Sequence, residues 1–340
     1  MDNKVLTTAK AASEKAQGRP RFWSTLASLL LRRREVSVFI VALVLIVYFQ
    51  SSNQAFFSQP NLRTISQIVA PWAIIAAGEV MLLICGEIDL SVGNVFALAP
   101  FVMFFTYQAG LPLWAGIICG LLVSAIVGLF NGLVTVLLKI PSFITTLGTL
   151  FLLNGLTLVT SQGFPRLTPD EGAFNQVFGN GPYAEILWAL AIVLLMQIIL
   201  SYTRWGLHTI ATGGNLLGAS ETGINVNRIK IGNFIVCSVF GGFVGILEAF
   251  RITSIDPLAG GTGVMFMAVA GAVIGGTSLM GGLGTIVGAF LGTLVLAILQ
   301  EGFTLLGVSA FTFDLILGGA ILIAMILNVR LQLLREAGRQ

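Results

Sequence analysis

Two carboxylates and a hydroxyl, Glu87, Asp89 and Ser91, stand close together between Gly86 and Gly93 in an otherwise apolar stretch. Carboxylates can bind a proton or a cation, or accept hydrogen bonds. A charge at membrane depth costs about 2.5–3.5 kcal/mol on insertion scales, so it needs a reason. We expect the backbone to unwind here, and either of two compatible interpretations would explain the residues. They form a hinge or the lining of a polar path, or Asp89 and Ser91 cap the following helix.

Further polar residues lie in apolar surroundings, among them Glu79, Asn131 and Glu248. Each could face a polar path, or could form a hydrogen bond to a neighbouring helix, which is the more common situation. The candidates for a path or hinge are Glu87, Asp89, Ser91, Gly93, Asn131 and Glu248.

Residues for covalent or metal chemistry are sparse. His208 is the only histidine, and Cys85, Cys119 and Cys237 lie inside apolar runs. The phosphate-binding pattern G-x-x-x-x-G-K-[ST] does not occur in the sequence. We therefore expect no enzyme activity, no bound metal or cofactor and no nucleic-acid partner, and any ATP hydrolysis should belong to another chain.

The elements that position these residues must lie in lipid. Of the 340 residues, 56% are apolar and 10% charged, whereas soluble domains carry about 25% charged residues. Apolar runs near the membrane-crossing length of about 20 residues predict an all-α polytopic membrane protein with about ten transmembrane helices. The runs are 36–50, 65–85, 92–108, 112–138, 141–160, 185–202, 231–250, 265–281, 284–300 and 311–328.

Positive charge predicts the orientation. With ten spans, fifteen of the 18 Lys and Arg residues fall on one side, and only Arg63, Arg166 and Arg251 on the other. We therefore place both termini in the cytoplasm, with a basic tail at 1–35, a transmembrane domain at 36–328 and a C-terminal tail at 329–340. Residues 21–34 could form a helix lying on the inner leaflet, or a disordered tail.

Glycine spacing suggests close helix packing and an internal repeat. Gly128 and Gly132 in one span, and Gly284, Gly288 and Gly292 in another, recur every four residues. Each set should form one smooth helix face, as in ordinary membrane-helix packing or in movable helix seams. The stretches 126–132 and 286–292 agree at five of seven positions. A shift of five spans reverses direction, which suggests an inverted repeat of spans 2–5 and 7–10.

Two loops carry features of docking surfaces. In the predicted cytoplasmic loop 203–230 we expect a short helix at 215–222, stopped by Gly223. Its apolar residues either enter a groove of a partner or pack back onto the membrane domain. In the outer loop 161–184, the side chains of Arg166, Asp170 and Glu171 could steer a charged partner, or could simply be solvated.

Three ordered stretches carry a resemblance to a known family: Gly86–Gly93, Gly213–Asn225 and Gly275–Gly284. Over residues 36–328 the chain resembles the permease subunits of ribose-type sugar ABC importers. Two departures are Glu87, where the family more often has glycine, and the altered small-residue pattern at Ser220–Thr222.

The resemblance implies a ten-helix fold like that of cobalamin-type importers, in the bacterial cytoplasmic (inner) membrane. It implies a second permease subunit, a cytoplasmic ATPase that binds ATP and Mg²⁺, and an external solute-binding protein. It also assigns an ATPase-coupling loop, whose residues here are Gly213, Gly214, Asn215, Leu216, Leu217, Ala219, Glu221, Gly223 and Ile224. The expected function is import of a monosaccharide or related polyol by alternating access. The alternative is an ion-gradient-driven secondary transporter.

Overall fold

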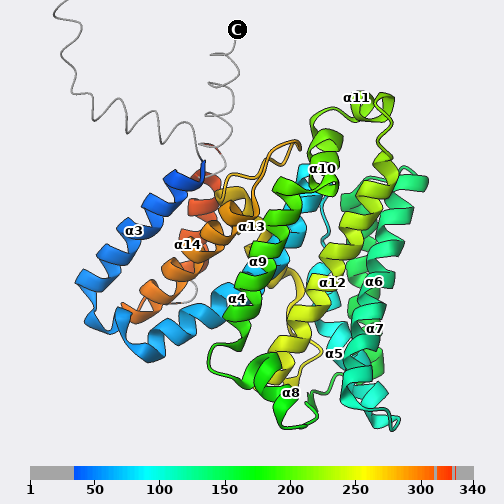
Figure 1. Cartoon of the computed structure of the whole chain (residues 1–340). Coiled ribbons are helices and arrows are strands. Elements are labelled where there is room, and N and C mark those ends of the chain that lie inside the picture. The colour runs from blue at the N-terminus through cyan, green and yellow to red at the C-terminus, as the bar shows by residue number, and fades with distance from the viewer. Residues whose placement is uncertain (1–33, 310–311, 324–325, 327–340) are drawn as a thin grey trace, which may run out of the picture.

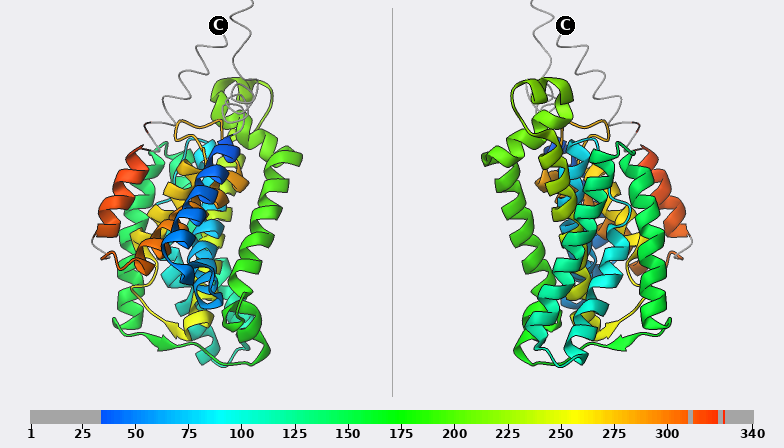
Figure 2. Two further views of the ribbon diagram at one scale, coloured as in Figure 1. Left: turned by 90° about the vertical axis from the view of Figure 1, so that its left-hand side faces the viewer. Right: turned by 90° about the vertical axis from the view of Figure 1, so that its right-hand side faces the viewer.

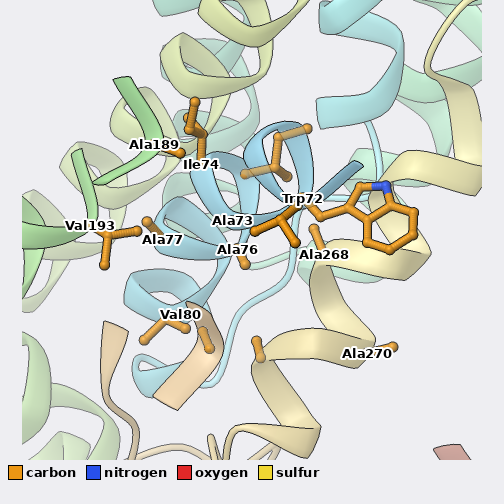
Figure 3. Packing of buried hydrophobic residues seen from close by; sticks show 14 of the residues in the cluster. Trp72, Ala73, Ile74, Ala76, Ala77, Val80, Ala189, Val193, Ala268 and Ala270 are labelled. Carbon is orange, nitrogen blue, oxygen red and sulfur yellow. The ribbon is translucent and has the colours of Figure 1, made fainter. Parts of the chain in front are cut away.

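Helix α4 (Gln59–Ile84) forms the centre of the fold, and nearly all of its second half is buried. The computed structural model describes residues 34–309, 312–323 and 326. A helix that is apolar on every side is stable only when other helices surround it, and α4 packs against α9 (Ala184–Tyr202), α12 (Val226–Ile252), α13 (Gly261–Ile274) and α14 (Ile286–Leu305). Figure 3 shows this packing around Trp72, Ala76 and Val80.

The remaining helices confirm the all-α membrane architecture. Seven helices in the described part of the chain are long and apolar enough to cross a bilayer, and three shorter apolar helices occupy the other predicted spans. Besides those already given, they are α3 (Arg34–Ser52), α5 (Val92–Gln108), α6 (Leu113–Leu137), α7 (Ser142–Ser161) and the helix Thr312–Ile323. The predicted basic tail, its surface helix and the C-terminal tail lie outside the described residues, apart from the first two residues of α3.

The predicted boundaries of spans eight and nine are wrong by several residues. Helix α13 ends at Ile274 instead of 281, because Gly276 adopts a left-handed φ of 95° and breaks the helix. Helix α14 begins at Ile286, after Thr285, whose side chain caps it. Gly284 therefore lies in the connection before α14 and does not share a helix face with Gly288 and Gly292.

A wide apolar surface faces outward from the helices. Val47 of α3, Phe151 of α7 and Leu194 of α9 are each 64–67% exposed. In water such a surface would be costly, whereas hydrocarbon solvates it well. The exposed apolar side chains therefore belong against lipid, as the composition predicts.

Closely approaching helix pairs place glycines at their contacts. A Cβ atom added to Gly128 of α6 would lie 2.5 Å from the carbonyl oxygen of Phe234 on α12. One added to Gly292 of α14 would lie 2.0 Å from the carbonyl oxygen of Gly271 on α13. Both halves of the sequence echo thus form tight helix seams. The inverted repeat itself stays a prediction.

The two long loops lie at opposite ends of the helices (Figures 1 and 2). One end carries α10 (Arg204–Gly214) and α11 (Leu216–Glu221). The other carries α8 (Ala173–Asn175), the π-helical turn Gln176–Asn180 and a two-stranded antiparallel ribbon, β1 (Arg166–Leu167) with β2 (Ser254–Ile255). The ribbon joins the outer loop to the segment that follows α12. A short 3-10 helix, η1 (Gln54–Phe57), connects α3 to α4.

Candidate functional site

The connection between α4 and α5, residues 85–91, is not helical, as expected from its composition. Helix α4 ends at Ile84, and Gly86 takes a left-handed φ of 76°. The amide of Glu87 donates to the carbonyl of Leu82 at 3.0 Å, which closes the helix end. The chain then runs through the interior of the protein until α5 begins at Val92.

Asp89 is the most enclosed charged residue of this connection, with no exposed surface. Its Oδ1 accepts hydrogen bonds from the Ser91 amide at 2.9 Å and from the Ser91 hydroxyl at 2.6 Å. Ser91 is the N-cap of α5, but its side chain makes no capping bond and is directed to Asp89 instead. Ser91 therefore occupies the predicted cap position, but its hydroxyl binds Asp89 instead of a backbone amide of α5.

Three further helices contribute donors around Asp89. The Nδ2 of Asn131 on α6 lies 3.4 Å from both carboxylate oxygens and donates to the Ser91 hydroxyl at 2.9 Å. The hydroxyl of Ser238 on α12 donates to Asp89 Oδ2 at 3.1 Å. Thr149 on α7 donates to Asn131 Oδ1 at 2.7 Å. We call these five residues the Asp89 hub.

The hydrogen bonds of the Asp89 hub join α6, α7 and α12 to the start of α5. A buried carboxylate loses its hydration and is tolerated when several donors replace the lost water. All five side chains are at most 4% exposed, so the hub is closed to solvent in this conformation. Such an arrangement can fix the beginning of α5 relative to three helices, which is the behaviour expected of a hinge anchor.

A second buried carboxylate, Glu79 of α4, lies beside the hub. Its Oε2 accepts from the Asp89 amide at 3.5 Å, and its Oε1 accepts from the Cys237 thiol of α12 at 3.5 Å. Glu79 and Cys237 are both completely buried. These contacts extend the polar centre to α4.

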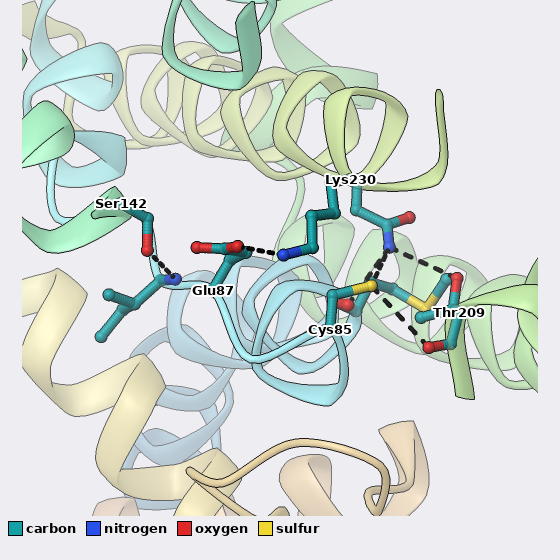
Figure 4. A network of polar contacts seen from close by, with 8 residues as sticks. Cys85, Glu87, Ser142, Thr209 and Lys230 are labelled. Carbon is teal, nitrogen blue, oxygen red and sulfur yellow. Dashed lines mark hydrogen bonds and ion pairs between the residues drawn. The ribbon is translucent and has the colours of Figure 1, made fainter. Parts of the chain in front are cut away.

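Glu87 and Gly93, although close in sequence to Asp89, have different surroundings. Glu87 forms an ion pair with Lys230 at the start of α12, with 2.5 Å between Oε1 and Nζ (Figure 4). Gly93 lies against α13: an added Cβ would sit 1.9 Å from the carbonyl oxygen of Gly261. The beginnings of α5 and α13 therefore touch backbone to backbone.

Glu248 does not join the hub. It lies near the far end of α12, where it forms an ion pair with Arg251. Arg251 also approaches Glu185 of α9, with 3.5 Å between Nε and Oε1. This cluster connects α9 to α12 beside the β1–β2 ribbon, and it places Glu248 at the end of the molecule opposite to α11.

The predicted short helix in the loop 203–230 is present as α11. Asn215 caps it by accepting from the Gly218 amide at 3.0 Å. Gly223 follows its end with a φ of 85°, and the Ile224 amide donates to the Ala219 carbonyl at 3.1 Å, a typical helix stop. Leu217 is 76% exposed, so the loop presents an apolar side chain to its surroundings, as predicted.

The other predicted residues of this loop differ in their exposure. Ala219 is buried and Ile224 half-buried, whereas Leu216 and Glu221 are exposed. Gly213, at the end of α10, packs on the end of α4: an added Cβ would meet the Ile84 carbonyl oxygen at 1.5 Å. The loop thus packs onto the helices at Gly213 and Ala219, and it exposes the apolar side chains of Leu216 and Leu217 on α11.

The predicted outer docking residues lie at the opposite end of the molecule. Arg166 is half-buried in the β1–β2 ribbon. Asp170 is exposed, but its Oδ1 accepts from Asn175 Nδ2 at 2.8 Å and from the Gly172 amide at 3.2 Å. Glu171 is half-buried. Asp170 therefore also serves as a local structural residue of the loop.

Sequence reasoning missed Thr149 and Ser238 of the Asp89 hub. It also missed Lys230 and Glu185 as ion-pair partners, and Asn233, which joins α12 to α4. Thr149, Asn233 and Ser238 are polar residues within apolar helices, the same signal that identified Asn131. Lys230 counted only as a cytoplasmic charge, and nothing in its local sequence indicates Glu87 as its partner.

The geometry defines a class of protein: a polytopic helical membrane protein with a hydrogen-bonded polar centre at the break between two helices and an exposed apolar helix at one end. The chain belongs to the family described as the branched-chain amino acid transport system / permease component, whose model matches residues 61–326.

Individual relatives cover most of the chain. It is 42% identical over 309 residues to the xylose/arabinose import permease protein of Sulfolobus acidocaldarius, covering 88% of this chain and 86% of the relative. It is 34% identical over 300 residues to the ribose import permease protein of Escherichia coli K12, covering 86% and 93%. It is 33% identical over 306 residues to the autoinducer 2 import system permease protein of Photorhabdus laumondii, covering 89% and 92%. No solved structure matches the chain. The resemblance to ribose-type importer permeases is confirmed.

Proposed function

We propose that this chain is the transmembrane permease subunit of an ATP-binding-cassette importer that moves a monosaccharide or a related polyol into the cytoplasm. The observation that carries the proposal is the similarity to the xylose/arabinose import permease over 88% of the chain. The Asp89 hub contains hydroxyls, an amide and a carboxylate but no basic residue, which agrees with transport of an uncharged, hydroxyl-rich solute. A phosphorylated solute would instead call for a cluster of basic groups.

In this proposal the energy comes from a separate ATPase chain, which holds ATP and Mg²⁺ and docks on α11. The exposed apolar side chains of Leu216 and Leu217 support such a contact, because isolated apolar groups on a polar loop gain from burial in a partner's groove. An external binding protein would deliver the solute to the opposite end, near Arg166, Asp170 and Glu171. A second permease subunit would complete the path, and both termini would lie in the cytoplasm.

The alternative is a secondary transporter that uses an ion gradient and needs a free carboxylate as the ion site. The candidates for such a site are Glu79, Glu87, Asp89 and Glu248. Glu87 and Glu248 are each held in an ion pair, Asp89 accepts hydrogen bonds from Ser91, Asn131 and Ser238, and Glu79 accepts from the Asp89 amide and the Cys237 thiol. These contacts favour a structural use of the carboxylates, so the ATP-driven proposal is preferred.

The test is uptake by vesicles that contain the chain together with the ATPase and binding protein of its own system. With ATP and Mg²⁺ enclosed, no ion gradient, and radiolabelled xylose, arabinose or ribose outside, we expect accumulation of at least one of the three sugars. Vesicles enclosing ADP are the control. Accumulation by the isolated chain, driven by an ion gradient without any ATPase, would instead establish the alternative.

A further inference from the structure

Lys230 and Glu87 connect two segments that are 143 residues apart in the sequence. Lys230 lies near the beginning of α12, directly after the loop that carries α11. Their side chains are only 16% and 11% exposed. An ion pair sheltered in this way is screened less by salt than a surface pair, and removal of one partner leaves the other charge half-buried and unpaired.

Helix α10, which precedes α11, is also connected to the end of α4. Asn233 of α12 donates to the Met81 carbonyl of α4 at 3.2 Å and to the Thr209 hydroxyl of α10 at 3.3 Å. Trp205 of α10 donates from Nε1 to Asn233 Oδ1 at 2.8 Å. Figure 4 shows Thr209 and Cys85 meeting at this junction, next to the Glu87–Lys230 pair. Helices α10 and α12, which flank α11, are therefore both attached to α4.

A third contact is made by backbones. Gly213 of α10 lies directly on the Ile84 carbonyl, and the Gly282 amide donates to the same oxygen at 2.8 Å. No side chain lies between these backbones, so α10 and α4 are in direct contact and a displacement of one presses on the other. The end of α4 is thus held from two sides, and Glu87 is the charged residue that follows it.

The other end of the same connection enters the Asp89 hub. Only Ile88 separates Glu87 from Asp89, and extended residues span about 3.3–3.6 Å each. A displacement of Glu87 that exceeds this short reach must therefore also move Asp89 and the start of α5. From these contacts we propose that the Glu87–Lys230 ion pair is a positioning contact that transmits movement of the α10–α11–α12 segment to the beginning of α5. This inference rests on the proposed function, because it assumes that a partner moves α11.

The ion pair is distinctive within the structure. Among the ion pairs of the described residues, the other two lie in the Glu185–Glu248–Arg251 cluster at the opposite end. Coupling between sites has to be measured and cannot be read from proximity alone. A double-mutant cycle on the pair measures it directly.

The experiment compares Glu87→Gln, Lys230→Gln and the double variant in vesicles containing the complete transporter. It records sugar uptake per ATP hydrolysed, together with basal ATP hydrolysis. We expect each single variant to retain basal hydrolysis and to lose about fivefold or more in uptake per ATP, within the range of typical coupling free energies. We expect the double variant to lose no more than either single variant, since all three lack the same contact.

Lys139→Gln is the matched control, because it removes an exposed positive charge outside the ion pairs of the structure; we expect uptake per ATP to be unchanged. The pair can be broken from either side, so a folding failure of one variant leaves the other as the test. The inference would be overturned if both single variants lost less than twofold in uptake per ATP. It would also be overturned if the loss in the double variant equalled the product of the two single losses. If the wild-type transporter itself showed no ATP-driven uptake, the proposed function would fail instead.

Discussion

At the scale of single residues, Asp89 shows how a carboxylate can be accommodated in an apolar interior without a cation beside it. No ion pair of the described residues includes Asp89. Its oxygens instead accept hydrogen bonds from Ser91, Asn131 and Ser238. Each of these hydrogen bonds also fixes the position of the segment that supplies the donor.

Two adjacent glycines provide a sharp test at this scale. An added Cβ on Gly213 would lie 1.5 Å from the Ile84 carbonyl oxygen, whereas one on Gly214 would meet nothing within 4 Å. We expect Gly213→Ala to lower the free energy of unfolding by about 1–3 kcal/mol or more, because α10 must move away from α4. Thermal unfolding of the detergent-solubilised protein measures the difference.

Gly214→Ala is the matched control for that measurement, and we expect its unfolding temperature to stay close to that of the wild-type protein. Equal unfolding temperatures for the two variants would show that α10 does not pack on α4 as described.

The sequence predicts residue types and approximate depth better than it predicts partners. Asp89, Ser91 and Asn131 share a signal, polarity within an apolar run, and the structure brings them together. Glu87 and Glu248 carry the same signal, yet each belongs to a separate ion pair. The difference is made by helix packing, which places Lys230 and Arg251 beside them and which no local pattern encodes.

At the scale of elements, α11 is a short helix that packs little of its surface. Its six residues run from Leu216 to Glu221, and only Ala219 is buried. An isolated helix of this length is unstable in water. Here the Asn215 cap and the helix stop at Gly223 hold it in shape, so its exposed leucines are presented in a fixed arrangement.

A substitution on α11 tests whether this surface is a docking site. We expect Leu217→Ser to leave thermal stability within about 0.5 kcal/mol of wild type, as for surface positions generally, and to abolish co-purification of the partner ATPase. Val177→Ser is the control, because Val177 is an exposed apolar residue in the turn Gln176–Asn180, at the end opposite to α11. Undiminished recovery of the ATPase with Leu217→Ser would argue against docking at α11.

Helices long enough to span the bilayer were predictable because twenty consecutive apolar residues leave little alternative in lipid. The ends of α13 and α14 were less predictable, since Gly275 and Gly284 continue the apolar composition while the backbone at Gly276 leaves the helix. The β1–β2 ribbon could not be predicted, because each two-residue strand depends on a partner nearly ninety residues away.

At the scale of the whole molecule, the structure separates two ends that the charge distribution assigns to opposite sides of the membrane. The loop with α11 and the loop with the β1–β2 ribbon lie at opposite ends of the helices (Figure 1). The excess of Lys and Arg near α11 predicts that this end faces the cytoplasm.

Cysteine labelling decides the orientation. In a variant without Cys85, Cys119 and Cys237, we expect Leu217→Cys to react with an impermeant maleimide only after the cells are permeabilised. Leu167→Cys, which is also highly exposed, should react in intact cells. The reverse pattern would invert the topology and exclude ATPase docking at α11.

Composition and spacing predicted the class of fold and the apolar helices, but not the contacts between distant loops. The end of α4, the end of α10 and the connection before α14 converge at Ile84, Gly213 and Gly282. These contacts join backbones rather than side chains, so they depend on the complete arrangement of helices and leave only glycines as a trace in the sequence.

The wide sequence spacing of the Asp89 hub has a consequence for biosynthesis. Ser238 lies 149 residues beyond Asp89 and Asn131 lies 42 residues beyond it. While the ribosome is still translating α6, the carboxylate has only Ser91 to accept from. The hub is therefore complete only after α12, which supplies Ser238, has been synthesised.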